Sequence, residues 1–278
     1  PDFSKYQPCR AKVLGLLEEV TSQIEPLSLD EAYLDVTENR WAEASGLEVA
    51  RRLKARIREV TGLTASAGVG PNKMVAKLAS EVDKPDGLVA VSREEVQAFL
   101  GPLPVNSLFG VGPKTASRLE RLGIKTVSDV RVRSEAILVE LLGRHGHELW
   151  QLAHGRDDRA VVSERAPKSR GSEVTLAEDV KDRRRVMELI QVQAVRVGGD
   201  LVRSGLAGRT VTLKIRYGNF QTITRSRTLR DATDDAARIA QIAMELCRAT
   251  QVGARPVRLV GVSLSNLTAG GTAQLRLF

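Results

Sequence analysis

Apolar residues recur at helical spacing in some stretches of the chain and alternate with polar residues in others, which predicts a mixed α and β protein. The helical spacing is clear in residues 12–20, and the strand-forming stretches QIEPLSL and AYLDV come directly after them. We therefore expect residues 23–36 to form a β-hairpin with Asp30 and Glu31 near its bend.

An amphipathic helix is predicted after the hairpin, followed by alternating strands and helices. TASAGVG, at residues 64–70, reads as a strand, NKMVAKLASE as a helix, KPDG as a turn and LVAV as a buried strand, so the first 92 residues indicate an α/β layer. Residues 93–155 then favour short helices separated by glycine and proline. In the amphipathic helix the expected apolar face consists of Leu47, Ala50, Leu53, Ile57 and Val60, and the expected solvated face of Arg51, Arg52, Lys54, Arg56 and Arg58.

The last part of the chain has a different order of elements. Residues 164–171 are charged, contain a proline and have no apolar period, so we interpret them as a linker between domains. The order predicted after them is that of a split β-α-β-β-α-β fold. The six elements are expected at residues 172–178, 182–203, 209–217, 221–229, 232–249 and 257–264.

The strand RTVTLKIRY in this region alternates between an apolar face and a basic face. Its polar side carries Lys214 and Arg216, and the next strand, whose register the sequence leaves ambiguous, adds Arg225 and Arg227. Cations and hydroxyl groups with few aromatic rings suit phosphate contacts better than base stacking. We therefore expect this face to bind the backbone of duplex DNA, together with the cations of the linker stretch, Lys168 and Arg170.

Charge is distributed unevenly along the 278 residues, whose formal net charge is +8. Residues 164–278 contain 20 Lys and Arg against 11 Asp and Glu, a net charge of +9, whereas residues 1–163 have a net charge of −1. The asymmetry favours a polyanionic partner, nucleic acid rather than membrane. Solubility alone is the other explanation of a basic domain.

The composition favours a soluble cytoplasmic protein. No apolar run approaches the roughly 20 residues that a membrane helix needs, and PDFSKYQPCR has no signal-peptide core. The two cysteines, Cys9 and Cys247, lack metal-ligand spacing and read as thiols in a reducing compartment.

The stretch LFGVGPKTASRLERLGI, at residues 108–124, has the pattern of a helix-hairpin-helix element. Pro113 opens the predicted helix and Gly123 closes it. The free N–H groups at the helix start favour an anion, so we expect Gly110, Val111, Gly112 and Lys114 to bind a DNA phosphate. A purely structural helical hairpin is the alternative.

LLGRHGHELWQLAHG is interpreted as a second, weaker copy, in which Gly143 and Gly146 precede a helix and contact DNA. Its three histidines are spaced like possible metal ligands but have no carboxylate or cysteine set beside them. We expect His145, His147 and His154 to have surface or packing roles.

The adjacent acids at the predicted hairpin bend suit a metal site. Phosphoryl transfer needs carboxylates that converge on Mg²⁺, and two acids at a bend can converge because the pleat is broken there. Alone, the pair Asp30-Glu31 is also a common surface feature.

Three blocks give that pair a context. SLDEAYLDVT, SAGVGPNKMVAKLASEVDKPDGL and FGVGPKTASRLERLGI resemble the Y-family translesion DNA polymerases, in particular the bacterial DinB (DNA polymerase IV) branch. KSRGSEVTL, VTLKIRYGNFQTITRS and the order of elements after residue 170 resemble the little-finger domain of that family. The similarity covers essentially the whole chain.

The resemblance implies an α+β multidomain protein with five parts: a partial palm (1–92), a helical thumb (93–163), a linker (164–171), a little finger (172–266) and a tail (267–278). It implies that Asp30 and Glu31 are catalytic carboxylates that bind Mg²⁺, two ions in the complete enzyme, and that Lys77 binds the triphosphate of the incoming deoxynucleotide. Asp35 matches a recurring acid, and we expect it to be structural.

One difference from the family is important. Its members begin with a strand carrying the first metal-binding aspartate, followed by the fingers, and this sequence contains neither. We expect a fragment that cannot extend a primer.

The last residues, QLRLF, resemble the bacterial sliding-clamp motif, with Gln274, Leu275, Leu277 and Phe278 as anchors after a flexible leader.

The function we predict is therefore template-directed, lesion-bypass DNA synthesis by two-metal nucleotidyl transfer. The partners are primer-template DNA, deoxynucleoside triphosphates and the sliding clamp, and the chain is expected to be a monomer. A non-catalytic, DNA- and clamp-binding ImuB-like relative is the alternative, against which the acid pair argues. A helix-hairpin-helix repair nuclease would leave the split domain and the clamp motif unexplained.

Overall fold

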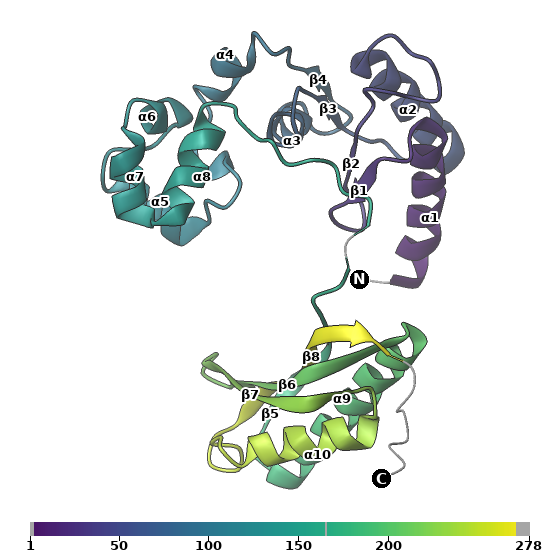
Figure 1. Ribbon diagram of the computed structural model, residues 1–278, viewed down its shortest axis with the longest axis vertical. Coiled ribbons are helices and arrows are strands. Elements are labelled where there is room, and N and C mark those ends of the chain that lie inside the picture. Colours follow the sequence, from purple (N-terminus) through teal and green to yellow (C-terminus); the bar gives the residue numbers. More distant parts are fainter. Residues whose placement is uncertain (1–2, 165, 271–278) are drawn as a thin grey trace. The chain divides into compact units, whose positions relative to one another are not determined.

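The protein consists of two compact units, residues 1–165 and residues 166–278 (Figure 1). The structure, a computed structural model, describes residues 3–164 and 166–270. Within these ranges no helix is both long and apolar enough to cross a membrane.

The N-terminal unit begins with a helix and a short hairpin. Helix α1 (Phe3–Val20) is longer than the predicted 12–20 stretch, and strands β1 (Ile24–Pro26) and β2 (Ala32–Leu34) pair antiparallel. Ile24 lies opposite Leu34 and Pro26 opposite Ala32. The predicted hairpin is confirmed, and its bend contains both acids.

Helix α2 (Gly46–Thr61) follows, and its packed face differs from the prediction. Val49 is buried, whereas Val60 is 40% exposed. The helix contacts α1, β3 and β4, and its buried residues are Val49 and Ile57, which lie on one face, whereas Val60 is in the last turn. The expected solvated face is also wrong at Lys54, whose side chain is only 15% exposed because its Nζ contacts the turn after α3, at Asp86 and Gly87.

Two parallel strands precede and follow helix α3 in the sequence. Strand β3 (Ala67–Val69) pairs with β4 (Leu88–Ala90), and α3 (Lys73–Val82) connects them. The predicted buried strand LVAV is only half-buried over Leu88–Ala90, because a two-stranded sheet leaves much of each strand uncovered. Asn72 caps α3, its side chain accepting the N–H of Val75 at 3.0 Å.

Short helices fill the rest of the N-terminal unit. They are α4 (Val96–Leu100), the 3₁₀-helix η1 (Val105–Ser107), α5 (Pro113–Glu120), α6 (Val127–Arg131), α7 (Glu135–Leu142) and α8 (Arg144–Ala153). Their fully buried leucines, among them Leu100, Leu119, Leu138 and Leu149, share one core with Met74 and Val75 of α3. The helical part therefore packs directly on the helix that carries Lys77.

The C-terminal unit has the predicted split β-α-β-β-α-β order. Its elements are β5 (Ser169–Val180), α9 (Arg183–Arg203), β6 (Leu206–Tyr217), β7 (Thr222–Thr233), α10 (Ala236–Cys247) and β8 (Val257–Ala269). The strands form one antiparallel sheet in the order β5-β8-β6-β7. Strand β5 begins at Ser169, so the end of the predicted linker is already part of the sheet.

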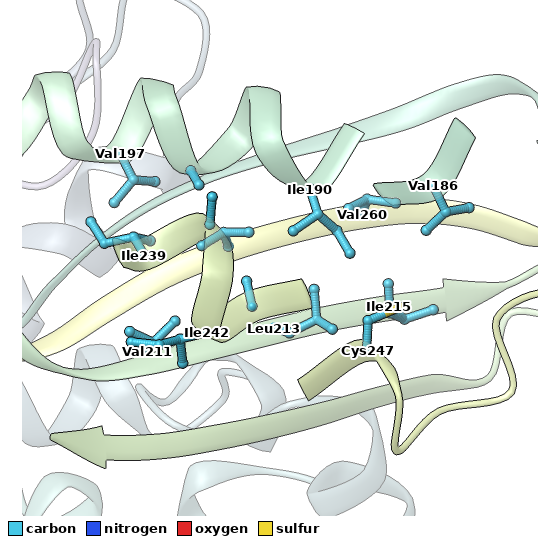
Figure 2. Close-up of a cluster of buried hydrophobic side chains, with 14 of the residues drawn as sticks. Val186, Ile190, Val197, Val211, Leu213, Ile215, Ile239, Ile242, Cys247 and Val260 are labelled. Atoms are coloured by element: carbon cyan, nitrogen blue, oxygen red, sulfur yellow. The ribbon is translucent and has the colours of Figure 1, made fainter. Parts of the chain in front are cut away.

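Both helices pack on one face of this sheet (Figure 1). In Figure 2, Val186 and Ile190 of α9 face Ile215 of β6, and Ile239 and Ile242 of α10 complete the same core. Val211, Leu213, Ile215 and Tyr217 are all at most 1% exposed, which confirms the apolar face predicted for β6.

Candidate active site and nucleic-acid interface

The bend between β1 and β2 carries both predicted metal ligands. The N–H groups of Leu27 and Ser28 donate to the Glu31 carbonyl at 2.9 and 3.4 Å and close the bend. The Ser28 hydroxyl donates to Asp30 Oδ1 at 2.7 Å and accepts the Asp30 N–H at 3.3 Å. The acid pair lies outside the strand ladder, where the pleat does not impose opposite directions on neighbouring side chains.

Lys77, the predicted nucleotide ligand, reaches this bend from α3. Its Nζ donates to Glu31 Oε1 at 2.6 Å and to Glu81 Oε1 at 2.8 Å. Burial lowers the pKa of Lys77, but its hydrogen bonds to Glu31 and Glu81 outweigh that effect, so the pKa lies above its usual value. The structure therefore holds a protonated lysine against one acid of the pair, while the carboxylate of Asp30 contacts Ser28.

The other carboxylates near the bend are separate from this pair. Asp35 Oδ1 accepts the N–H of Thr37 at 3.0 Å, a local turn contact that fits a structural role. Over residues 3–164 and 166–270, no three His, Cys, Asp or Glu side chains gather into a group able to hold a metal ion.

A buried ion pair that the sequence analysis missed fixes the hairpin to α3. Lys73 Nζ lies 2.5 Å from Glu25 Oε2, and the two side chains are only 6% and 4% exposed. Lys73 is one helical turn before Lys77, and Glu25 is in β1. The hairpin and α3 thus make two contacts, the part-exposed Lys77–Glu31 contact and the buried Lys73–Glu25 contact.

Residues 155–163, which we name the strap, cross this pair after α8. Glu25 Oε2 accepts the N–H of Val162 at 2.9 Å, and Lys73 donates to the Ala160 carbonyl at 3.1 Å. Asn72 also donates to the Gly155 carbonyl at 2.8 Å. The strap therefore connects the end of α8 to β1, through Glu25, and to the start of α3, through Asn72 and Lys73.

The strap also holds a buried carboxylate, that of Asp157. It accepts the N–H of Met74 at 2.9 Å and two hydrogen bonds from Arg159, at 2.6 and 2.8 Å. Burial raises the pKa of Asp157, but the hydrogen bonds from Arg159 and Met74 outweigh that effect, and the pKa lies below its usual value. Asp157 is therefore an ionised anchor between the strap and the start of α3.

The helix-hairpin-helix pattern is confirmed at the start of α5. Gly112 is the N-cap residue, no side chain caps the helix, and Pro113 is in its first turn. Gly110 has φ +87°, a backbone conformation that favours glycine, and a Cβ there would lie 2.7 Å from the ring of His145. The exposed N–H groups at this end suit an anion.

The four predicted residues at this end differ in what they offer. Gly110, Gly112 and Lys114 are exposed, whereas Val111 is buried and its N–H donates to the Leu108 carbonyl at 3.1 Å. Val111 therefore packs the turn, and its N–H is not free for a phosphate.

The weaker copy is a helical hairpin of a different kind. Gly143 connects α7 to α8, but Gly146 lies inside α8, so the prediction that it precedes the helix is wrong. A Cβ at Gly146 would lie 1.9 Å from the Leu138 carbonyl oxygen, because the backbones of α7 and α8 approach closely there. Gly146 is needed for helix packing.

The histidines of this hairpin make contacts that fit the expected surface or packing roles. His147 Nδ1 lies 2.6 Å from Glu135, and His154 Nδ1 lies 2.8 Å from the Trp150 carbonyl. His145 packs against Gly110.

The register of β7 corrects the predicted basic face of the C-terminal unit. Arg225 pairs with Leu213 and Arg227 pairs with Val211. Directly paired residues of antiparallel strands point to the same face, so both arginines lie on the helix side of the sheet. There Arg227 donates to Glu245 at 2.6 Å. The prediction that they share the open face with the β6 cations is wrong.

Arg170 is also on the helix side, since it pairs with Leu264 and its Nε lies 3.5 Å from Asp200 of α9. The open face retains Lys214, which is paired with Glu173 at 2.8 Å, and Arg216. Hydroxyl groups surround these two cations, from Thr210, Thr212, Thr222, Thr224, Ser226, Thr228 and Ser263. The open face is therefore hydroxyl-rich and only moderately basic.

Two predicted sites differ in how much the structure says of them. Lys168 is exposed directly before β5. The clamp-binding residues Gln274, Leu275, Leu277 and Phe278 lie outside the described residues.

Comparisons with known families match all three regions described above. The impB/mucB/samB family matches residues 1–81, the IMS family HHH motif matches residues 93–124, and the impB/mucB/samB family C-terminal domain matches residues 167–277.

Curated relatives are similar over the whole chain. DNA polymerase IV of Alkalilimnicola ehrlichii is 43% identical over 100% of this chain and 79% of that protein, and DNA polymerase IV of Listeria monocytogenes serotype 4b is 41% identical over 99% and 78%.

Solved structures give the same picture. A Y-family DNA polymerase chimera of Dbh and Dpo4 has a TM-score of 0.86 at 27% identity, over 96% of this chain and 77% of that chain. An insertion ternary complex of Dbh DNA polymerase has a TM-score of 0.61 at 26% identity, over 96% and 77%. The chain therefore belongs to the Y family of DNA-directed DNA polymerases, in its DNA polymerase IV branch.

Proposed function

We propose that the chain serves template-directed synthesis past DNA lesions, with Asp30 and Glu31 as carboxylates of the active site and Lys77 as the ligand of the nucleotide triphosphate. The observation that carries the proposal is the contact of Lys77 with Glu31 at the hairpin bend. A cation beside two acids suits a nucleotide that arrives with its phosphates and Mg²⁺ together. In that arrangement Lys77 exchanges its contact with Glu31 for a phosphate oxygen.

The donor chemistry of the bend fits magnesium. Asp30 is exposed and offers carboxylate oxygens, and Glu31 offers a second set that is half-buried. Mg²⁺ is commonly held by one or two carboxylates together with water and substrate phosphates. When bound at Asp30 and Glu31, such ions would supply charge neutralisation at the phosphates and activation of the attacking hydroxyl. The Ser28 hydroxyl donates to one oxygen of the Asp30 carboxylate, which orients this proposed ligand.

The proposed grip on DNA uses the backbone rather than the bases. Gly110, Gly112 and Lys114 at the start of α5 suit a strand phosphate, and Lys214 and Arg216 on the open sheet face suit the duplex. With this use in mind we assign residues 1–92 to a palm, 93–163 to a thumb and 172–266 to a little finger. Such contacts depend on the sugar-phosphate backbone and not on the identity of the bases, so the binding tolerates damaged template bases.

Several finer features belong to the same proposal. We expect a cytoplasmic monomer that binds the bacterial sliding clamp through Gln274 to Phe278. Deleting those five residues should abolish clamp binding in surface plasmon resonance while the affinity for DNA stays the same, and a parallel loss of DNA affinity would contradict the assignment. We also expect residues 1–278, as an isolated polypeptide, to bind DNA without extending a primer, because the resemblance implies three carboxylates and we assign two.

Primer extension by the native gene product tests the proposal. Asp30→Ala should lower the rate by about 10²- to 10³-fold or more, because charge on the transferred phosphate loses a stabilising partner. Glu38→Gln is the matched control, an exposed acid on the same segment, and should retain the normal rate. Extension that is unchanged in Asp30→Ala would refute the active-site assignment, and a gene product that binds DNA with no extension at all would favour the binding-only alternative.

A further inference from the structure

A cavity of about 410 Å³ lies between the acid bend and the helix-hairpin-helix element. Tyr33 of the hairpin and Met74 and Lys77 of α3 form one part of its lining. Leu103 and Phe109 from the segment before α5, and Arg159 of the strap, form the other. Lys77 connects the cavity to the acid pair, and Phe109 directly precedes Gly110. The opening is therefore next to both proposed phosphate contacts, Lys77 on one side and the start of α5 on the other.

Phe109 is the most exposed ring around the cavity. It is 66% exposed, and its neighbour Leu108 is 2% exposed. A single exposed apolar side chain needs no explanation by itself. What distinguishes Phe109 is the guanidinium of Arg159, which lies 4.6 Å from its ring centroid at the same opening.

Two hydrogen bonds to the buried carboxylate of Asp157 fix the position of Arg159. Its Nε and Nη2 donate to the two oxygens of Asp157, whose side chain is 1% exposed and which also accepts the N–H of Met74. Among the residues that the structure describes, none accepts from the third nitrogen, Nη1. The side chain of Arg159 is 43% exposed. A guanidinium held by two hydrogen bonds with one donor edge left open is arranged for a further anion.

The chemistry of this opening is that of a nucleic-acid strand. An open guanidinium edge suits a phosphodiester, and an exposed aromatic face suits a base or the apolar face of a deoxyribose. Lys77 and Arg159 are the cations in the lining of the cavity, where Lys77 contacts Glu31 and Glu81 and Arg159 contacts Asp157.

We propose that Phe109 and Arg159 bind the 3′-terminal nucleotides of the primer strand, with Phe109 against the terminal base or sugar and Arg159 on the adjoining phosphodiester. This inference rests on the proposed function, because the strand whose 3′ hydroxyl reaches Asp30 and Glu31 is the primer. It adds a contact that lies between the acid pair and the amides of α5 and belongs to neither.

The test is the binding of a primer-template that carries 2-aminopurine at the primer 3′ end. Phe109→Ala should weaken binding by about 5- to 30-fold, which is the lower range found for one stacked base, and should alter the fluorescence of the terminal 2-aminopurine. Phe109→Tyr keeps the ring and should bind normally, whereas Phe109→Leu should resemble Phe109→Ala. Because Phe109 is exposed, these variants should unfold at the wild-type urea concentration.

The chain offers a matched control in Phe220. That ring is 64% exposed, lies 4.6 Å from the guanidinium of Arg258, and Arg258 is held by Asp179 at 2.9 Å. Phe220→Ala should leave the terminal 2-aminopurine signal unchanged. A 2-aminopurine placed six nucleotides upstream should not respond to Phe109→Ala.

The outcomes separate this inference from the proposed function. If the wild-type chain binds the primer-template and Phe109→Ala changes neither affinity nor terminal fluorescence, the primer contact is wrong and the proposed function stands. If Phe109→Ala weakens deoxynucleotide binding alone, the cavity serves the incoming nucleotide and the inference is also overturned. If the wild-type chain does not bind primer-template DNA, both fail.

Discussion

Removing one partner of the buried Glu25–Lys73 pair should destabilise the N-terminal unit strongly. The side chains are 4% and 6% exposed, so neither charge can turn to water when its partner is lost. In Lys73→Met, Glu25 loses the hydrogen bond from the lysine and still accepts the N–H of Val162, at 2.9 Å. Loss of one partner of a buried pair costs about 3–5 kcal/mol, and we expect that decrease in the free energy of unfolding.

The double variant Glu25→Gln with Lys73→Met should cost much less than the single one. Neither charge of the pair remains in it, and the amide oxygen of glutamine can still accept the N–H of Val162. The double variant loses the hydrogen bond from Lys73 to the Ala160 carbonyl, and its hydrogen bond from the Val162 N–H goes to a neutral amide instead of a carboxylate. Together these changes should cost about 1–2 kcal/mol. The order of stability, with the double variant above the single one, is the signature of an uncompensated buried charge.

Tryptophan fluorescence isolates the unit concerned. The chain has two tryptophans, Trp41 and Trp150, and both lie in residues 1–165. Urea unfolding followed by their fluorescence therefore reports on the N-terminal unit. A cost below about 1 kcal/mol for Lys73→Met, or a double variant no more stable than the single one, would refute the reasoning.

Three further predictions concern other parts of the chain. The pKa of Asp157 is lowered in the folded state, so its ionised form contributes stability above its unfolded pKa of about 3.9, and this stability is lost as the pH falls through the lower folded value. Asp157→Asn should therefore lose less stability than the wild type between pH 5 and pH 3, measured by the urea midpoint. An equal loss would contradict the anchor role. Gly146→Ala should destabilise the α7–α8 hairpin by about 1–3 kcal/mol or more, because the new Cβ would meet the Leu138 carbonyl. Gly112→Ala has open space around it and should leave the free energy of unfolding within about 0.5 kcal/mol of the wild type. Similar urea curves for the two variants would contradict this prediction. Replacing Lys214 and Arg216 by Gln should reduce the slope of log binding constant against log salt concentration for duplex DNA by about two. Replacing Arg225 and Arg227 by Gln should reduce this slope less, because both lie on the helix side of the sheet. The reverse order would contradict the register of β7.

The elements were largely predictable from the sequence because their patterns are local. The hairpin at residues 23–36 follows from two short strand-forming runs with polar residues between them, and the alternation of Val211, Leu213 and Ile215 shows directly which side of β6 is buried. Strand β7 has no such signal, since threonine, serine and arginine fit either face. Its register depends on pairing with β6, which a single strand does not reveal.

The parts of the site that were missed are long-range. Glu25 and Lys73 are 48 residues apart, and the strap meets them from a further 87 residues along the chain. Helical periodicity alone does not show that Lys73 is buried and Lys77 is part-exposed, because the partner of Lys73 comes from a distant strand. Gly146 looks like a loop glycine until the close approach of α7 is known.

The affinity for a deoxynucleoside triphosphate tests the central claim most directly. We would measure it for the chain bound to a primer-template, with and without Mg²⁺, using the nucleotide complementary to the template base. The account predicts that Mg²⁺ raises the affinity by about tenfold or more in the wild-type chain, and by less than about twofold when Asp30→Asn and Glu31→Gln are combined. An equal effect of Mg²⁺ on both proteins would contradict the assignment of the acid bend as the metal-binding part of the active site.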